Sequence, residues 1–124
     1  VVLQELLRTL GLECDVVSTG RKGLEYFRGR HLPTIGQSKS HRPCLAFVDY
    51  DLPQMLGPEV IRKLREFEEE NGLEPSIIIG HTAYGEVEQA EMIESGADDI
   101  LPKPVNFERL QSLLTQYQMT GKLQ

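Results

Sequence analysis

One stretch of the sequence, Leu45 to Pro53, constrains the fold more than any other. Its apolar residues stop abruptly at Asp49, and a second acid, Asp51, follows before the proline. A short apolar run with such boundaries is typical of a buried strand in a parallel sheet. Asp49 then falls at the carboxyl end of that strand, where open α/β sheets bind their ligands. We therefore interpret the Asp49 carboxylate as free for chemistry.

Helical and strand patterns alternate along the rest of the chain. This alternation predicts an α/β fold, a parallel sheet with helices on both faces. Three more strands are expected at residues 14–17, 76–81 and 99–101. Helices are expected at residues 1–10, from Ser18 or Thr19 to about Arg28, from Pro58 to Asn71, between Ala83 and Gly96, and after an Asn106 cap.

The apolar stripes predict which side of each helix faces the core. Three consecutive acids, Glu68, Glu69 and Glu70, are expected on a solvated face, because the helix macrodipole disfavours acids near a carboxyl end. The predicted inward residues are Leu24 and Phe27; Val60, Ile61, Leu64 and Phe67; Val87, Ala90 and Ile93; and Phe107, Leu110, Leu114 and Tyr117.

Composition excludes several classes of function. The length of 124 residues predicts one domain with one core. A net charge of −6 argues against nucleic acid as a direct partner, because phosphate backbones are bound mainly through Lys and Arg. No apolar stretch approaches the roughly 18 to 20 residues of a membrane span. The only cysteines, Cys14 and Cys44, are expected to be reduced, packed thiols in a cytoplasmic domain rather than a zinc site.

Two other predicted strands also end beside reactive side chains, Thr82 and Lys103. The carboxyl ends of parallel strands lie along one edge, so these side chains could converge with Asp49. A carboxylate, a hydroxyl and an ammonium are what acyl-phosphate chemistry on an aspartate would use. The carboxylate attacks phosphorus, the ammonium neutralises one phosphoryl oxygen, and the hydroxyl donates to another. A divalent cation, Mg²⁺, is expected to offset the charge between the two anions.

Each of these residues also has an ordinary structural interpretation. Asp49 could cap the loop after its strand, Thr82 could cap the following helix, and Lys103 could be a surface lysine. We favour the chemical interpretation because the three residues stand at corresponding places after three strands. His81 precedes Thr82, so strand alternation points it to the opposite face, away from such a site.

Three segments together resemble the receiver domain of two-component signalling, found in response regulators and hybrid histidine kinases. They are residues 47–53 with Gly57 behind them, residues 77–83, and residues 96–104. The resemblance covers about residues 1–117 and implies a flavodoxin-like (CheY-like) doubly wound parallel sheet with strand order 2-1-3-4-5. It also implies a receiver domain over residues 1–118, with a long loop at 30–43, and a tail over residues 119–124.

The resemblance assigns a role to each site residue. Asp49 is the phosphoacceptor, Thr82 the switch hydroxyl and Lys103 the phosphate-binding cation. Asp49 and the backbone carbonyl of Asp51 are the Mg²⁺ ligands. The implied partner is a histidine kinase or a histidine phosphotransfer protein, with no nucleic acid or membrane contact; dimerisation stays open. The domain takes part in phosphotransfer rather than acting as a stand-alone enzyme, and a hybrid histidine kinase is the favoured parent.

The chain departs from the family pattern in two places. Receivers begin with a strand followed by an acidic pair that holds the metal, whereas this chain starts inside the first helix. We therefore expect a fragment with an apolar strand and acids upstream of Val1, and weak Mg²⁺ binding without them. Receivers also carry Tyr or Phe three residues before the lysine, where this chain has Ile100. Tyr84 is a candidate substitute for that ring.

These departures keep a second class of function open. A pseudo-receiver docks a partner protein without being phosphorylated, and the missing acids and Ile100 favour it. Asp49, Thr82 and Lys103 favour the phosphoacceptor. A flavodoxin-like nucleotide or cofactor binder has no support, because no Gly-rich phosphate loop follows any predicted strand.

Overall fold

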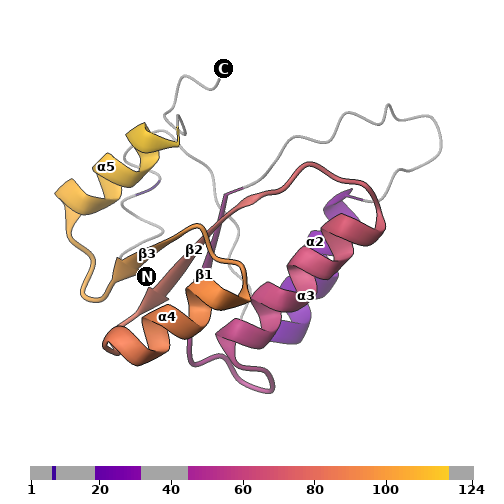
Figure 1. Ribbon diagram of the computed structural model, residues 1–124, viewed down its shortest axis with the longest axis horizontal. Helices are drawn as coiled ribbons and strands as arrows, with labels where there is room; N and C mark the ends of the chain where they lie inside the picture. The colour runs from indigo at the N-terminus through magenta and orange to yellow at the C-terminus, as the bar shows by residue number, and fades with distance from the viewer. Residues whose placement is uncertain (1–6, 8–18, 32–44, 118–124) are drawn as a thin grey trace.

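The computed structural model describes Leu7, residues 19–31 and residues 45–117 of the chain, with helices alternating with strands (Figure 1). The predicted strand at 14–17, most of the first helix, all but the first two residues of the long loop predicted at 30–43, and the predicted tail at 119–124 lie outside these residues. The elements are α2 (Gly20–His31), β1 (Leu45–Asp49), α3 (Gly57–Glu70), β2 (Ile77–Thr82), α4 (Glu86–Ser95), β3 (Asp99–Pro102) and α5 (Phe107–Gln116).

The three described strands form one parallel sheet in the order β1-β2-β3. Asp49 pairs with His81 across β1 and β2, and Thr82 pairs with Pro102 across β2 and β3. This order is the last part of the predicted order 2-1-3-4-5. The register brings the carboxyl ends of all three strands to one edge, which positions the candidate site.

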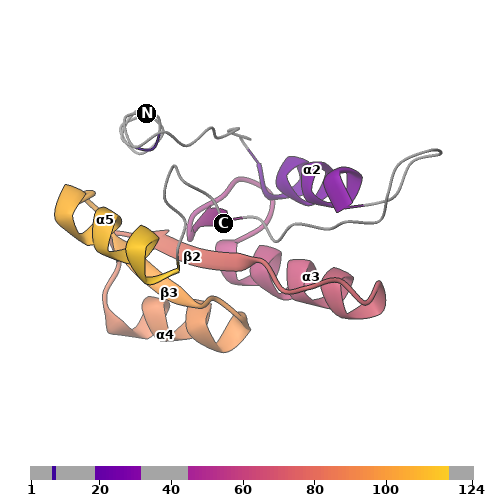
Figure 2. The same ribbon diagram turned by 90° about the horizontal axis from the view of Figure 1, so that it is seen from above.

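Helices cover both faces of the sheet, as Figure 2 shows for α4 on one side and α5 on the other. One core cluster joins residues of α2, α3 and α4 to the sheet, and a second joins α5 and Leu7 to the opposite face. Ile78 belongs to the first cluster and Ile79 to the second, as the alternation of strand side chains requires. None of the described helices is long and apolar enough to cross a membrane.

The predicted helix boundaries are largely confirmed. Thr19 accepts a hydrogen bond from the Lys22 backbone N–H at the start of α2, and Asn106 accepts one from Arg109 at the start of α5. Pro58 lies in the first turn of α3, where a missing N–H costs no hydrogen bond. After α3, Gly72 has a φ of 61°, a conformation that glycine adopts without steric cost. The carboxyl end of α2 differs from the prediction, because this helix continues to His31 rather than ending near Arg28.

The predicted inner face of α4 is wrong. Val87 is 78% exposed, and Ala90 and Ile93 are exposed as well. The helix instead buries Met92 and Ser95. Its apolar residues are spread around the helix, so their spacing does not define one side.

The inner face of α5 is predicted only in part. Leu110 and Leu114 are buried as expected, and Leu113 is buried with them. Phe107 is 39% exposed, contrary to the prediction, because it stands at the first residue of the helix and outside both core clusters.

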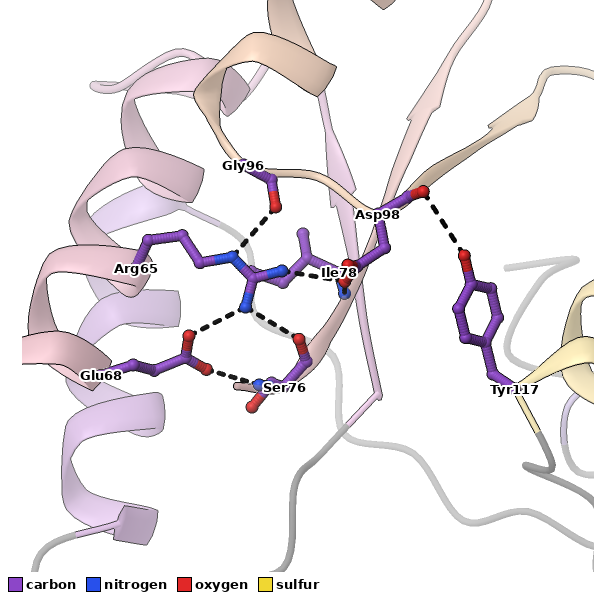
Figure 3. A network of polar contacts seen from close by, with 7 residues as sticks. All are labelled: Arg65, Glu68, Ser76, Ile78, Gly96, Asp98 and Tyr117. Carbon is purple, nitrogen blue, oxygen red and sulfur yellow. Dashed lines mark hydrogen bonds and ion pairs between the residues drawn. The ribbon is translucent and has the colours of Figure 1, made fainter. Parts of the chain in front are cut away.

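Glu68 is a further residue at which the predicted burial is wrong. Glu69 and Glu70 are exposed as predicted, but Glu68 is only 3% exposed. Its Oε1 atom lies 2.8 Å from Arg65 Nη1, and its Oε2 atom accepts a hydrogen bond of 2.7 Å from the Ser76 N–H. Burial of this carboxylate is possible because a cation and a backbone donor both compensate it. Figure 3 shows this network, which lies where β2 begins, at the opposite end of that strand from Thr82.

Candidate functional site

Asp49 and Lys103 meet at the carboxyl edge of the sheet. Asp49 is the last residue of β1, and Lys103 directly follows β3. The Lys103 Nζ atom lies 3.1 Å from Asp49 Oδ1, and the two side chains are 43% and 42% exposed. The Lys103 N–H also donates to the Thr82 carbonyl, which fixes the lysine backbone beside β2. The structure thus presents a carboxylate with an adjacent ammonium to solvent.

A tight loop after β1 holds Asp49 in place. The Gly57 N–H donates to the Tyr50 carbonyl over 2.7 Å, so the chain turns back on the end of β1. A Cβ atom on Gly57 would lie 2.3 Å from the Asp49 carbonyl oxygen. Only glycine permits this approach, which explains why Gly57 follows the Asp49 motif.

Thr82 stands at the same edge, as predicted, but its hydroxyl is engaged locally. The residue is 2% exposed and ends β2. Its Oγ1 atom accepts a hydrogen bond of 3.0 Å from the Tyr84 N–H. Among the described residues, the Thr82 hydroxyl makes no hydrogen bond with the Asp49 carboxylate, whose contact is with Lys103. Thr82 does not cap α4, whose N-cap is Gly85. The hydroxyl proton is left to donate to another acceptor.

Two tyrosines, Tyr50 and Tyr84, extend the site from its loops to α4; we call them the tyrosine pair. Their rings meet edge to face, with centroids 5.3 Å apart and an interplanar angle of 73°. The Tyr84 hydroxyl donates to Asp51 Oδ2 over 2.6 Å, and the Tyr50 hydroxyl donates to Glu91 Oε1 over 2.6 Å. Sequence reasoning named Tyr84 but missed Tyr50 and Glu91. The sequence carried a signal for both tyrosines. Each one closely follows a strand residue, Asp49 or His81, and these two residues are neighbours across β1 and β2.

The hydrogen bond to Glu91, together with desolvation and the charge of Glu91, raises the pKa of Tyr50 from 10.0 to about 12. The pKa of Tyr84 is also raised, first by its hydrogen bond to Asp51. A raised pKa in the folded state means that the neutral phenol stabilises the fold below pH 10. That contribution is lost as the pH rises through the folded-state pKa.

We expect Tyr50→Phe to remove one phenolate from the step near pH 12 in an ultraviolet absorbance titration. The reason is that the variant loses the phenol whose ionisation Glu91 opposes. Circular dichroism over the same pH range shows whether each protein stays folded. An unchanged step near pH 12 in a folded variant would contradict the assigned hydrogen bond.

The described residues supply only part of a cation site. Among them, no group of three or more His, Cys, Asp or Glu side chains could hold a metal ion. The Asp51 carboxylate accepts the hydrogen bond from the Tyr84 hydroxyl, so Asp51 could offer a metal ion only its backbone carbonyl. Of the described residues at this edge, Asp49 is then the one carboxylate whose contact is with a cation. Mg²⁺ prefers six oxygen ligands at near-octahedral positions, so further ligands would be needed.

His81 has a structural role in the sheet. It is 7% exposed, and its Nδ1 atom lies 2.7 Å from the Leu101 carbonyl oxygen. A carbonyl only accepts, so Nδ1 carries the proton. This contact joins β2 to β3 and leaves the histidine outside the Asp49–Lys103 pair.

Comparisons with known proteins agree with this arrangement. The sequence matches the response regulator receiver domain family over residues 1–115. It is 30% identical to hybrid signal transduction histidine kinase L of Dictyostelium discoideum, across 99% of this chain but only 7% of that protein. It is 31% identical to two-component response regulator 24 of Arabidopsis thaliana, across 90% of this chain and 70% of that protein.

Solved structures confirm the predicted fold class. The chemotaxis protein CheY4 of Vibrio cholerae matches with a TM-score of 0.71, over 93% of this chain and 85% of that chain. At 22% identity this likeness concerns the fold alone, and it confirms a flavodoxin-like (CheY-like) α/β fold. Since the family match spans residues 1–115, and the predicted motifs lie on the strands that the structure forms, the chain belongs to the response regulator receiver domain family of two-component signalling.

Proposed function

We propose that this receiver accepts a phosphoryl group on Asp49 from a phosphohistidine and changes conformation in response. The donor is a histidine kinase or a histidine phosphotransfer protein. The observation that carries the proposal is the 3.1 Å contact between Lys103 Nζ and Asp49 Oδ1, on side chains that are both accessible to solvent. The proposal includes a parent protein, a hybrid histidine kinase located in the cytoplasm. It is supported by the similarity to hybrid signal transduction histidine kinase L, of which this chain spans only 7%.

The transfer balances without a redox partner. An Asp49 carboxylate oxygen attacks phosphorus, the P–N bond to the donor histidine breaks, and its electron pair returns to the imidazole, which takes up a proton. The product is an acyl phosphate on Asp49. Hydrolysis then adds water at phosphorus, releases inorganic phosphate and regenerates the carboxylate with loss of a proton.

Lys103 and Thr82 supply the charge and the hydrogen bond that this step needs. The ammonium next to Asp49 neutralises charge on a phosphoryl oxygen, and it is in place before the group arrives. The Thr82 hydroxyl donates to a second phosphoryl oxygen once its side chain turns toward Asp49. We propose that Asp49 and the Asp51 carbonyl also hold Mg²⁺, which when bound offsets charge between the carboxylate and the phosphoryl group.

We expect the protein to gain one phosphoryl mass when it is incubated with acetyl phosphate and Mg²⁺ and then measured intact by mass spectrometry. The full natural protein that contains this chain is used, because the described residues supply only part of a cation site. Asp49→Asn should abolish the gain. Glu59→Gln, which alters an exposed acid in the first turn of α3, should leave it intact. A gain that persists in Asp49→Asn would contradict the proposal.

A pseudo-receiver remains the second candidate. It is favoured by Ile100, which is buried in the core where receivers carry an aromatic ring, and by the incomplete cation site. Two results together would support the pseudo-receiver instead. The folded wild type gains no phosphoryl mass, and the Asp49→Asn variant binds the partner protein as tightly as the wild type does.

A further inference from the structure

Ile100 of β3, three residues before Lys103, is packed into the core and is not free to report the state of the site. Ile100 is 9% exposed and belongs to the core cluster formed with α3 and α4. Its Cδ1 atom and the Met92 Sδ atom each lie 2.8 Å from where a Cβ atom on Gly80 would stand. With both side chains packed against the glycine of β2, Ile100 cannot swing outward without opening the core. A signal from Asp49 must leave the site by another route.

Tyr84 contacts Thr82, the loop after β1 and α4. Its N–H donates to the Thr82 hydroxyl, and its own hydroxyl donates to Asp51 in the loop after β1. Its carbonyl accepts a hydrogen bond of 2.9 Å from Gln89 Nε2 on α4. Its ring packs on Tyr50, whose hydroxyl reaches Glu91 on the same helix. The tyrosine pair therefore links the switch hydroxyl, the phosphoacceptor loop and α4.

The first half of α4 depends on these links. No residue from Glu86 to Glu91 is buried, and the buried residues of the helix, Met92 and Ser95, lie in its second half. Segments with few buried apolar contacts open at low free energy. Gln89 and Glu91 thus attach a weakly packed half-helix to the site through Tyr84 and Tyr50.

We propose that Tyr84 is a positioning residue that, with Tyr50, holds the first half of α4 in the unphosphorylated state and releases it when Asp49 is phosphorylated. The proposal rests on the proposed function of Asp49. When Thr82 turns its hydroxyl toward the phosphoryl group, the acceptor of the Tyr84 N–H moves away. The loop after β2 then shifts, and the bond to Asp51 and the contact with Tyr50 are lost together. Phosphorylation of Asp49 thereby leads to local opening of the first half of α4, residues 86–91.

Hydrogen exchange of the backbone amides at residues 86–91 tests this. In the unphosphorylated protein, Tyr84→Phe should speed their exchange several-fold, because it removes only the hydroxyl that bonds Asp51. Tyr50→Phe should act in the same direction by releasing Glu91. Tyr117→Phe removes a hydroxyl at the far end of α5 and serves as the matched control that leaves these amides unchanged. Acetyl phosphate with Mg²⁺ should speed exchange in the wild type and add little in Tyr84→Phe.

Failure of this inference differs from failure of the proposed function. If the protein gains a phosphoryl mass and exchange at residues 86–91 is the same in the wild type and Tyr84→Phe, the tyrosine link is overturned while the phosphoacceptor stands. If no phosphoryl mass is gained, the proposed function fails, and the unphosphorylated comparison still decides whether Tyr84 holds α4. A purely structural tyrosine would speed exchange without altering the response to phosphorylation, and that result would also overturn the inference.

Discussion

Replacing Arg65 with methionine should lower the free energy of unfolding by about 3 to 5 kcal/mol, the usual cost of removing one partner from a buried ion pair. The Arg65 side chain is 22% exposed and that of Glu68 is 4% exposed, so water cannot replace the guanidinium beside the carboxylate. A chemical denaturation curve measures the loss. Arg62→Met, an exposed arginine of α3 with one hydrogen bond of 3.3 Å to Ser95, is the control and should cost less than about 1.5 kcal/mol.

The expected effect is large because Arg65 bonds four residues in three segments of the chain. It bonds Glu68 on its own helix, the Ser76 carbonyl before β2, the Gly96 carbonyl after α4, and the Asp98 carboxylate before β3 (Figure 3). Adding Glu68→Gln to Arg65→Met should recover part of the loss, because the neutral amide can still accept from the Ser76 N–H. Equal stabilities of Arg65→Met and Arg62→Met would contradict this assignment.

Replacing Gly57 with alanine should destabilise the protein by about 1 to 3 kcal/mol and displace Asp49. The new Cβ atom would lie 2.3 Å from the Asp49 carbonyl oxygen and 2.9 Å from Tyr50 Cα. Both are backbone atoms and cannot rotate away, so the end of β1 must shift. We therefore also expect slower phosphorylation by acetyl phosphate, since the carboxylate moves relative to Lys103.

Gly29→Ala is the matched control for Gly57→Ala. Gly29 lies within α2, and a Cβ atom there would meet nothing within 4 Å. The same substitution should therefore stabilise the protein by about 0.5 to 1 kcal/mol, because alanine loses less backbone entropy in a helix. Calorimetric melting of both variants shows whether Gly57→Ala lowers and Gly29→Ala raises the stability of the protein. A Gly57→Ala variant as stable as the wild type would show that the loop adapts freely.

The strands and the edge where they end could be predicted because their signals are local and strong. Asp49 and Lys103 were each placed at a strand end from apolar runs of a few residues, and parallel pairing then brings them together. The inner face of α4 could not be predicted because its apolar residues do not gather on one side, so tertiary packing alone selects Met92 over Val87. Periodicity cannot resolve such a helix.

The burial of Glu68 and the contacts of the tyrosine pair could not be predicted for a different reason, although the sequence indicated Tyr84 itself as a candidate. The burial of Glu68 depends on Arg65 and on the Ser76 N–H, and the latter comes from a separate element. The bonds of Tyr50 and Tyr84 to Glu91 and Asp51 likewise depend on how two loops and a helix meet. Partners far apart in sequence leave no pattern in a single chain, although the short distance of each tyrosine from a strand end was a usable signal.

Chemical mapping of the phosphoryl group tests the proposed role of Asp49 most directly. The protein is phosphorylated with acetyl phosphate and Mg²⁺ and then treated with borohydride, which reduces an aspartyl phosphate to homoserine, and its peptides are sequenced by mass spectrometry. We predict homoserine at position 49 and aspartate unchanged at position 51. Homoserine at another acid, or a protein that carries a phosphoryl group yet yields none at position 49, would contradict the assignment of Asp49 as the phosphoacceptor.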